Sequence, residues 1–183
     1  MVQFSRFQRL AILALLVSGA LHLLLWFANN QPWESPTSFR KPALFGISTG
    51  LTLWSLLWVC QLLRPGRWSG WLNPLLTGSL LLEVGLITLQ AWRGEASHFN
   101  HRTAFDAAIE TTLLVLITAA SLAIFWITAR CFRAGQLDTV APQMRLAVQA
   151  GMLLLSLSCL FGFVITALGA QAAAAGQIGR AHV

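Results

Sequence analysis

Residues 83–110 read EVGLITLQAWRGEASHFNHRTAFDAAIE, and in this stretch one apolar run ends, a polar connector follows and a second apolar run begins. Glu83 lies inside the first run, whereas Asp106 and Glu110 open the second. Ionisable groups are costly at membrane depth, so each marks a functional hypothesis if the apolar runs cross a membrane. The stretch then predicts two membrane helices joined by a polar connector that contains His98 and His101. These three segments contain most of the candidate functional residues of the chain.

The composition of the whole chain predicts a membrane protein. Of its 183 residues 56% are hydrophobic, and the mean hydropathy of +0.68 exceeds what a soluble domain of this size can bury. Lysine and arginine number 12 against 6 acidic residues, but they fall singly or in pairs at the ends of apolar runs. This placement predicts contact with the lipid bilayer and no binding of nucleic acid. Cys60, Cys131 and Cys159 form no Cys-x-x-Cys pair and are expected to be packing residues.

Five apolar runs are long enough for a membrane-spanning helix, which needs about 20 residues. They lie at about 7–28, 43–63, 74–93, 105–129 and 146–169. The second helix is expected to start after Pro42 and the third at Asn73 and Pro74, because proline disrupts a helix interior. The predicted fold is therefore all-α: a polytopic helical membrane bundle that forms a single transmembrane domain over residues 1–183.

Lysine and arginine residues set the expected orientation. Seven lie on the side of the N-terminus, namely Arg6, Arg9, Arg64, Arg67, Arg130, Arg133 and Arg145. Five lie on the other side, namely Arg40, Lys41, Arg93, Arg102 and Arg180, together with Glu34, Glu95 and Asp106. We therefore expect a protein of the bacterial cytoplasmic (inner) membrane with its N-terminus in the cytoplasm and its C-terminus outside.

The first two helices carry polar and small residues that are expected to face protein. Ser18, His22 and Trp26 are four residues apart and form one stripe of helix 7–28. Two interpretations of His22 stay open: an imidazole hydrogen-bonded to a neighbouring helix, or a cofactor ligand or proton carrier. Gly46 and Gly50 form a Gly-x-x-x-Gly pair, which favours close approach of another helix of the same chain.

Glu83 lies near the expected bilayer midplane, in one polar stripe with Ser79 and Gln90. No lysine or arginine lies within the spans to pair with it, which favours a neutral carboxyl that gains and loses a proton. Helices 74–93 and 105–129 are joined by only about eleven residues, so they should be antiparallel neighbours. Glu83 and Glu110 are therefore predicted to face one another and to be the most functionally sensitive pair in the chain.

Asp106 also has a structural explanation. Thr103 precedes it by three residues, as in a capping box, and acidic residues favour the positive end of a helix. Glu110 lies more than a turn deeper, where a capping role explains it less well.

One block of the chain resembles a known group. The stretch QAWRGEASHFN at 90–100, continuing to TAFD at 103–106, is similar to a block in a group of uncharacterised bacterial multi-pass membrane proteins. The resemblance covers about residues 80–183. It implies a helical membrane fold and no particular activity. Because those proteins are longer, it also implies that this chain is the front part of a longer protein.

Three classes of function fit these residues. In a membrane redox subunit, His22 and His98 or His101 would bind haem b or a metal ion while Glu83 relays protons. In a proton-coupled transporter or channel-like protein, Glu83 and Glu110 would be the proton carriers. In both of these classes, Glu83 and Glu110 are the candidate catalytic residues.

In a structural or assembly subunit of a membrane complex, the polar residues would be scaffold. Small residues at 158, 162, 166 and 170 would then pack against other membrane subunits or a second copy of the chain. Nucleotide-driven transport, serine hydrolysis and zincin chemistry lack their motifs, since the chain has no phosphate loop, no Gly-x-Ser-x-Gly and no His-Glu-x-x-His.

Overall fold

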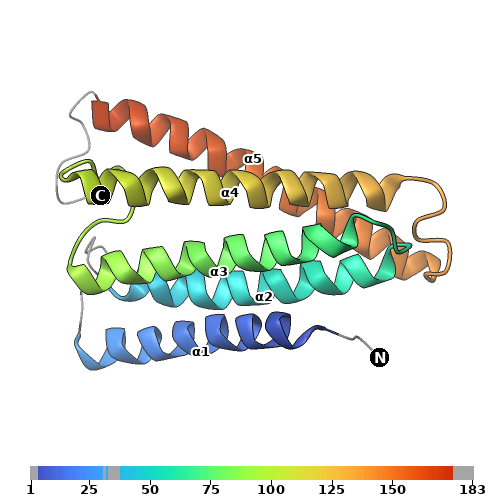
Figure 1. Ribbon diagram of the computed structural model, residues 1–183, viewed down its shortest axis with the longest axis horizontal. Coiled ribbons are helices and arrows are strands. Elements are labelled where there is room, and N and C mark those ends of the chain that lie inside the picture. Colours follow the sequence, from blue (N-terminus) through green and yellow to red (C-terminus); the bar gives the residue numbers. More distant parts are fainter. Residues whose placement is uncertain (1–3, 31, 33–37, 175–183) are drawn as a thin grey trace.

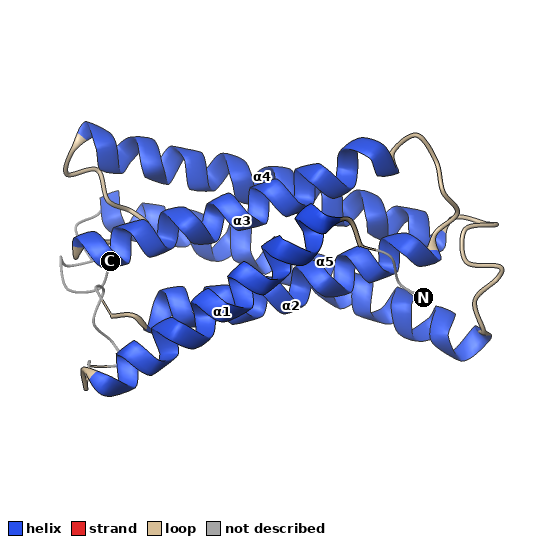
Figure 2. Cartoon of the chain, turned by 60° about the horizontal axis from the view of Figure 1, so that its bottom comes forward, coloured by secondary structure: helices blue, strands red, loops and turns tan. Residues whose placement is uncertain are grey.

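The computed structural model describes residues 4–30, 32 and 38–174 and contains five helices and, in these residues, no strand (Figures 1 and 2). All five are long and apolar enough to cross a membrane, with mean hydropathies of 1.5 to 2.3 over their most apolar windows. The predicted all-α membrane bundle is confirmed. Glu34, Arg180 and His182 lie outside the described residues. The helices are α1 (Arg6–Ala28), α2 (Arg40–Leu62), α3 (Ser69–Arg93), α4 (Ala104–Phe132) and α5 (Pro142–Ala174).

Each helix packs against the next one along the chain, and α1 also touches α3. Figure 1 shows α1 to α4 side by side and α5 crossing them obliquely. The connectors 63–68 and 133–141 lie at one end of the bundle, which we call the arginine end. The connector 94–103 lies at the opposite end, which we call the polar end. The predicted antiparallel contact of α3 with α4 is therefore confirmed.

Two predicted helix starts were wrong, and both errors involve proline. Helix α2 begins at Arg40, so Pro42 lies inside its first turn, where backbone N–H groups have no helical acceptor and proline is tolerated. Helix α3 begins at Ser69, so Pro74 lies inside it. The carbonyl of Gly70 then lacks its helical donor, but Gly70 is exposed near the helix end, where water can satisfy that carbonyl.

Glycines let α1 and α2 approach at backbone distance. A Cβ at Gly46 would lie 2.7 Å from the Cα of Gly19, and a Cβ at Gly19 would lie 2.6 Å from the backbone nitrogen of Ile47. A Cβ at Gly50 would meet the side chain of Leu16 at 2.8 Å. The Gly-x-x-x-Gly pair therefore packs within the chain, as the sequence predicted.

Helix α5 has much less contact with the bundle than the other helices. Only 6% of its most apolar window is buried, compared with 28% to 44% for α1 to α4. Polar contacts join it to α4: the Thr128 hydroxyl lies 2.8 Å from the Ser156 hydroxyl and 3.3 Å from the Met152 carbonyl, and the Gln149 amide donates to the Cys131 carbonyl at 2.9 Å.

Helix α5 also contacts the connector 94–103 at the polar end. A Cβ at Gly169 would come within 2.5 Å of the Phe99 ring, so the connector 94–103 rests directly on the α5 backbone. Only a glycine leaves room for the ring at this distance.

Candidate functional site

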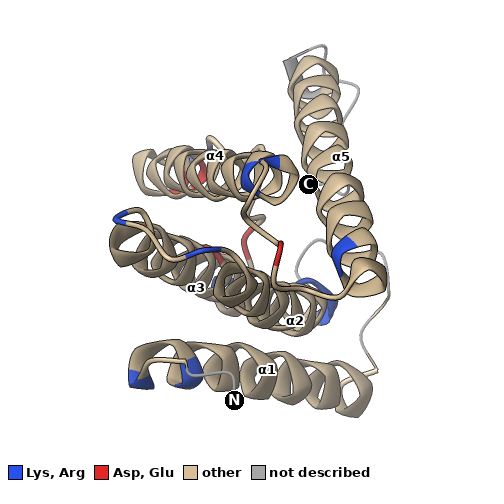
Figure 3. Cartoon of the chain, turned by 90° about the vertical axis from the view of Figure 1, so that its right-hand side faces the viewer, with Lys and Arg blue, Asp and Glu red and all other residues tan. Residues whose placement is uncertain are grey.

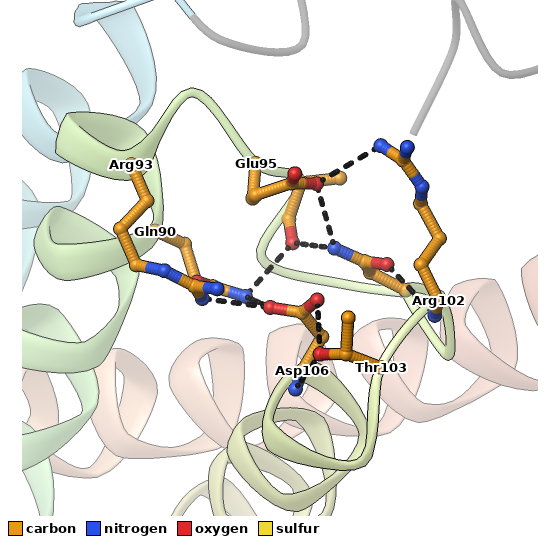
Figure 4. A network of polar contacts seen from close by, with 8 residues as sticks. Gln90, Arg93, Glu95, Arg102, Thr103 and Asp106 are labelled. Carbon is orange, nitrogen blue, oxygen red and sulfur yellow. Dashed lines mark hydrogen bonds and ion pairs between the residues drawn. The ribbon is translucent and has the colours of Figure 1, made fainter.

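The most extensive polar network of the described residues lies at the polar end and is centred on Asp106 (Figure 4). The Asp106 side chain is 1% exposed and accepts three hydrogen bonds. Gln90 Nε2 donates to Oδ1 at 3.0 Å, Arg93 Nη1 pairs with the same oxygen at 2.7 Å, and the Thr103 hydroxyl donates to Oδ2 at 2.7 Å. Arg93 also donates to Gln90 Oε1. We call Gln90, Arg93, Thr103 and Asp106 the Asp106 cluster.

Local sequence explains how these side chains meet. Gly94 adopts φ 69° and ends α3, which turns the chain back over the helix. Thr103 caps α4 by accepting from the Asp106 backbone N–H at 3.1 Å, so the capping role predicted for this pair is confirmed. The Asp106 carboxylate is thereby directed at α3 and ties the ends of the two helices together.

The rest of the connector is folded onto this cluster. Asn100 is buried and donates to the Ala96 carbonyl at 3.1 Å, and its side-chain oxygen accepts from the Arg102 backbone at 3.2 Å. Arg102 pairs with Glu95 at 3.3 Å; the arginine side chain is exposed and the glutamate is half-buried. The connector therefore has a fixed conformation held by side-chain hydrogen bonds rather than by secondary structure.

Glu110 holds the connector from the α4 side. Its Oε1 accepts from the Phe99 backbone N–H at 2.9 Å, and its Oε2 lies 3.1 Å from His101 Nε2, within ion-pair distance but without hydrogen-bond geometry. Phe99 has φ 55°, a conformation that costs a non-glycine residue about 1–2 kcal/mol. The Glu110 carboxylate thus stabilises a strained turn, and the Phe99 ring reaches Gly169 from it.

No hydrogen bond or ion pair joins Glu110 to Glu83 in the part of the chain that the structure describes. Glu83 is 6% exposed and makes no hydrogen bond or ion pair among those residues. Its helix neighbours Leu80 and Val84 belong to a buried apolar cluster with α1 and α2, and Ile87 packs with apolar residues of α4. The carboxyl therefore lies in an apolar core, where a charge without a partner is strongly disfavoured.

His98 contacts α2 rather than another histidine. Its Nδ1 lies 3.2 Å from Lys41 Nζ and 3.0 Å from the Ser97 hydroxyl. Burial, and secondarily the charge of Lys41, lower the pKa of His98 to about 4, so the imidazole is neutral near pH 7.

Both ring nitrogens of His22 have protein partners. The Trp92 indole N–H donates to Nε2 at 2.9 Å, so the ring proton is on Nδ1, which donates to the Ser18 carbonyl at 2.7 Å. Phe39 and Trp92 also pack against the ring, with centroids 5.7 Å and 6.1 Å away. This geometry favours the hydrogen-bonded interpretation of His22, because it leaves no lone pair for an iron or another metal.

The three histidines that the structure describes do not form a common ligand set. His22 contacts Trp92, His98 contacts Lys41, and His101 contacts Glu110. Within residues 4–30, 32 and 38–174 no three His, Cys, Asp or Glu side chains are placed to hold a metal ion. The arrangement supports packing and charge compensation better than haem or metal binding.

Sequence reasoning missed the roles of Gln90, Arg93 and Lys41. Gln90 was placed in a polar stripe without a partner, and the two basic residues were counted only for orientation. For Gln90 and Arg93 the available signal was their position inside the block at 90–106, which contains the whole Asp106 cluster, whereas Lys41 lies far from that block in the sequence. Comparisons with protein-family models, curated proteins and solved structures gave no match to this chain.

Proposed function

We propose that the chain is an assembly subunit of a membrane complex and that the half of α5 nearer the polar end packs against a transmembrane helix of another subunit. The observation that carries this proposal is the 6% burial of the apolar α5 window, against 28% to 44% for the other four helices. A helix with so few contacts in its own chain has most of its surface free for a partner.

The side chains of α5 support the same proposal. Ser158 and Gly162 are exposed, and a Cβ at Gly162 would meet nothing within 4 Å. At Gly19, Gly46 and Gly50, by contrast, a neighbouring helix of this chain occupies the space that a Cβ would take. Small residues let membrane helices approach closely, so the unfilled face of α5 is suited to a second helix.

The satisfied polar groups favour assembly over redox chemistry. The Asp106 carboxylate, both nitrogens of His22 and one oxygen of Glu110 have protein partners. Such contacts fix a connector and a helix pair, which is what a scaffold requires.

A second candidate function is proton-coupled transport, and Glu83 favours it. A buried carboxyl without a described partner contributes nothing evident to the packing of the bundle. An intramembrane acid of this kind is a default hypothesis for a proton carrier. In this reading Glu83 exchanges its proton when the apolar cluster around it opens.

For localisation, we propose the bacterial cytoplasmic membrane with the arginine end in the cytoplasm. The support is the excess of arginine at that end, since positive residues favour the cytoplasmic side. Reporter fusions after Arg102 are expected to be active only outside the cytoplasm. A fusion there that is active only in a cytoplasmic assay would reverse the orientation.

The assembly proposal is tested by photocrosslinking in native membranes. A photoreactive residue replaces Ser158 on α5 or, as the matched control, Gly85, which is equally exposed on α3. We expect a discrete protein adduct from position 158, none from position 85, and loss of the adduct when Gly162→Leu is added. Adducts with lipid alone at position 158, or the same protein band from both positions, would refute the proposal.

A further inference from the structure

An open apolar groove of about 440 Å³ lies between α2 and α5, towards the arginine end. Its volume is within the range of about 300–1,000 Å³ typical of ligand sites. We call it the α2–α5 groove. It is lined by residues 51, 52, 55, 56, 58 and 59 of α2 and residues 144, 147, 148, 151, 152 and 155 of α5.

The side chains that line the groove are apolar apart from the hydroxyls of Thr52 and Ser55 and the indole N–H of Trp58. The Ser55 hydroxyl already donates to the Leu51 carbonyl at 2.9 Å, so it needs no ligand to satisfy it. Gly151 leaves open space, since a Cβ there would meet nothing within 4 Å. The lining thus suits a hydrocarbon chain, which the bilayer supplies from the side.

Positive charge is concentrated at the same end. The stretches 63–68 and 130–145 contain five arginines and one acidic residue, Asp138. Arg64 and Arg145 both approach this carboxylate, at 3.8 Å and 3.9 Å. One carboxylate cannot neutralise two guanidinium groups, so a net positive charge remains between them.

Both arginines are close in the sequence to residues that line the groove. Arg145 follows the lining residue Met144 directly, and Arg64 follows the lining residue Val59 by five residues. At the polar end, in contrast, two arginines have a carboxylate each: Arg93 pairs with Asp106, and Arg102 pairs with Glu95. Figure 3 looks at the bundle from the arginine end and shows α5 on one side of it, at a steep angle to the other four helices.

From this juxtaposition we propose that the α2–α5 groove binds an anionic phospholipid. One acyl chain lies along the apolar lining, and the headgroup phosphate contacts Arg64 and Arg145. Arginine is suited to this contact because its planar guanidinium forms paired hydrogen bonds with phosphate oxygens. The lipid then fills the space between α5 and α2, so the site is independent of the partner helix proposed for the other half of α5.

The proposal is tested on the purified full-length chain in nanodiscs of phosphatidylcholine with a minority of phosphatidylglycerol. Spin-labelled forms of the two lipids report how much of each is motionally restricted at the protein surface. We expect a preference for phosphatidylglycerol that falls about fivefold for either Arg64→Gln or Arg145→Gln, since one arginine near a membrane attracts anionic lipid by a factor of this order. Asp138→Asn should raise the preference, because it removes the competing carboxylate.

Two further variants separate the groove from general attraction to positive charge. Arg9→Gln removes an exposed arginine of α1 and should lower the preference less than Arg64→Gln or Arg145→Gln does. Gly151→Phe fills the groove and should abolish the restricted anionic lipid while Arg64 and Arg145 remain. Equal restriction of both lipids by the unaltered chain, an equal effect of Arg9→Gln, or no effect of Gly151→Phe would each overturn the proposal.

Discussion

Replacing Asp106 by alanine should destabilise the bundle more than any other single change at the polar end. The substitution removes three accepted hydrogen bonds and leaves Arg93 without its ion-pair partner. Removing one partner of a buried ion pair costs about 3–5 kcal/mol, and because the Arg93 side chain is 33% exposed we expect the lower value. For a chain of this length, a loss of about 3 kcal/mol corresponds to a fall in melting temperature of roughly 6–12 °C.

The native cysteines provide the assay. Cys60 and Cys131 are buried and become reactive toward a fluorogenic thiol dye only when the helices separate. A melting curve of the detergent-solubilised protein with this dye measures the effect of Asp106→Ala directly. Asp106→Asn keeps the shape and part of the hydrogen bonding and should cost about half as much.

The matched control is Thr112→Ala, also on α4. The Thr112 hydroxyl is exposed and donates only to the Ala108 carbonyl of its own helix, so its removal should change the melting temperature by less than about 2 °C. If Asp106→Ala melts within the range of this control, the Asp106 cluster does not hold the polar end together and the reasoning fails.

Three further expectations follow from single contacts. Glu83→Leu should melt at or above the temperature of the unaltered chain, because a buried carboxyl without a described partner is replaced by an apolar group; a large loss would reveal a structural partner. The contribution of His98 to stability should fall as the pH drops from about 6.5 toward 4, since in that window the unfolded chain takes up a proton at His98 that the folded chain, with a pKa of about 4, does not. His98→Gln should remove that part of the pH dependence measured in thermal melts. Gly46→Leu should separate α1 from α2 and lower the free energy of unfolding by about 3 kcal/mol or more. Gly85→Leu should be tolerated, because a Cβ at Gly85 would meet nothing within 4 Å.

The sequence was sufficient for the helices but not for their starting points. Apolar runs of about 20 residues predict spans because lipid requires every backbone group to be satisfied within the helix. Pro42 and Pro74 misled the assignment of starts, because proline is tolerated in the first turn of a helix and where the carbonyl that it leaves unpaired is exposed to water, and the sequence pattern shows neither condition. The close packing of Gly46 against another helix of the same chain was predicted correctly from the spacing of Gly46 and Gly50 alone.

The candidate site was located by the sequence but its contacts were not. The polar connector and its carboxylates were recognised as unusual in an apolar chain, and the cap formed by Thr103 and Asp106 followed from spacing. The pairing of Lys41 with His98 joins residues 57 positions apart, which no local pattern encodes. The bond from Trp92 to His22 is likewise a property of how α1 meets α3.

The contacts of α5 also bear on the order in which the protein is made. Thr128, the Cys131 carbonyl and the Phe99 ring, which receive α5, all precede it in the chain and leave the ribosome first. Helices α1 to α4 can therefore complete their packing while α5 is still being synthesised. Helix α5 would then enter the membrane beside helices that are already packed, and an error in the turn at Phe99 would also disturb the docking of α5.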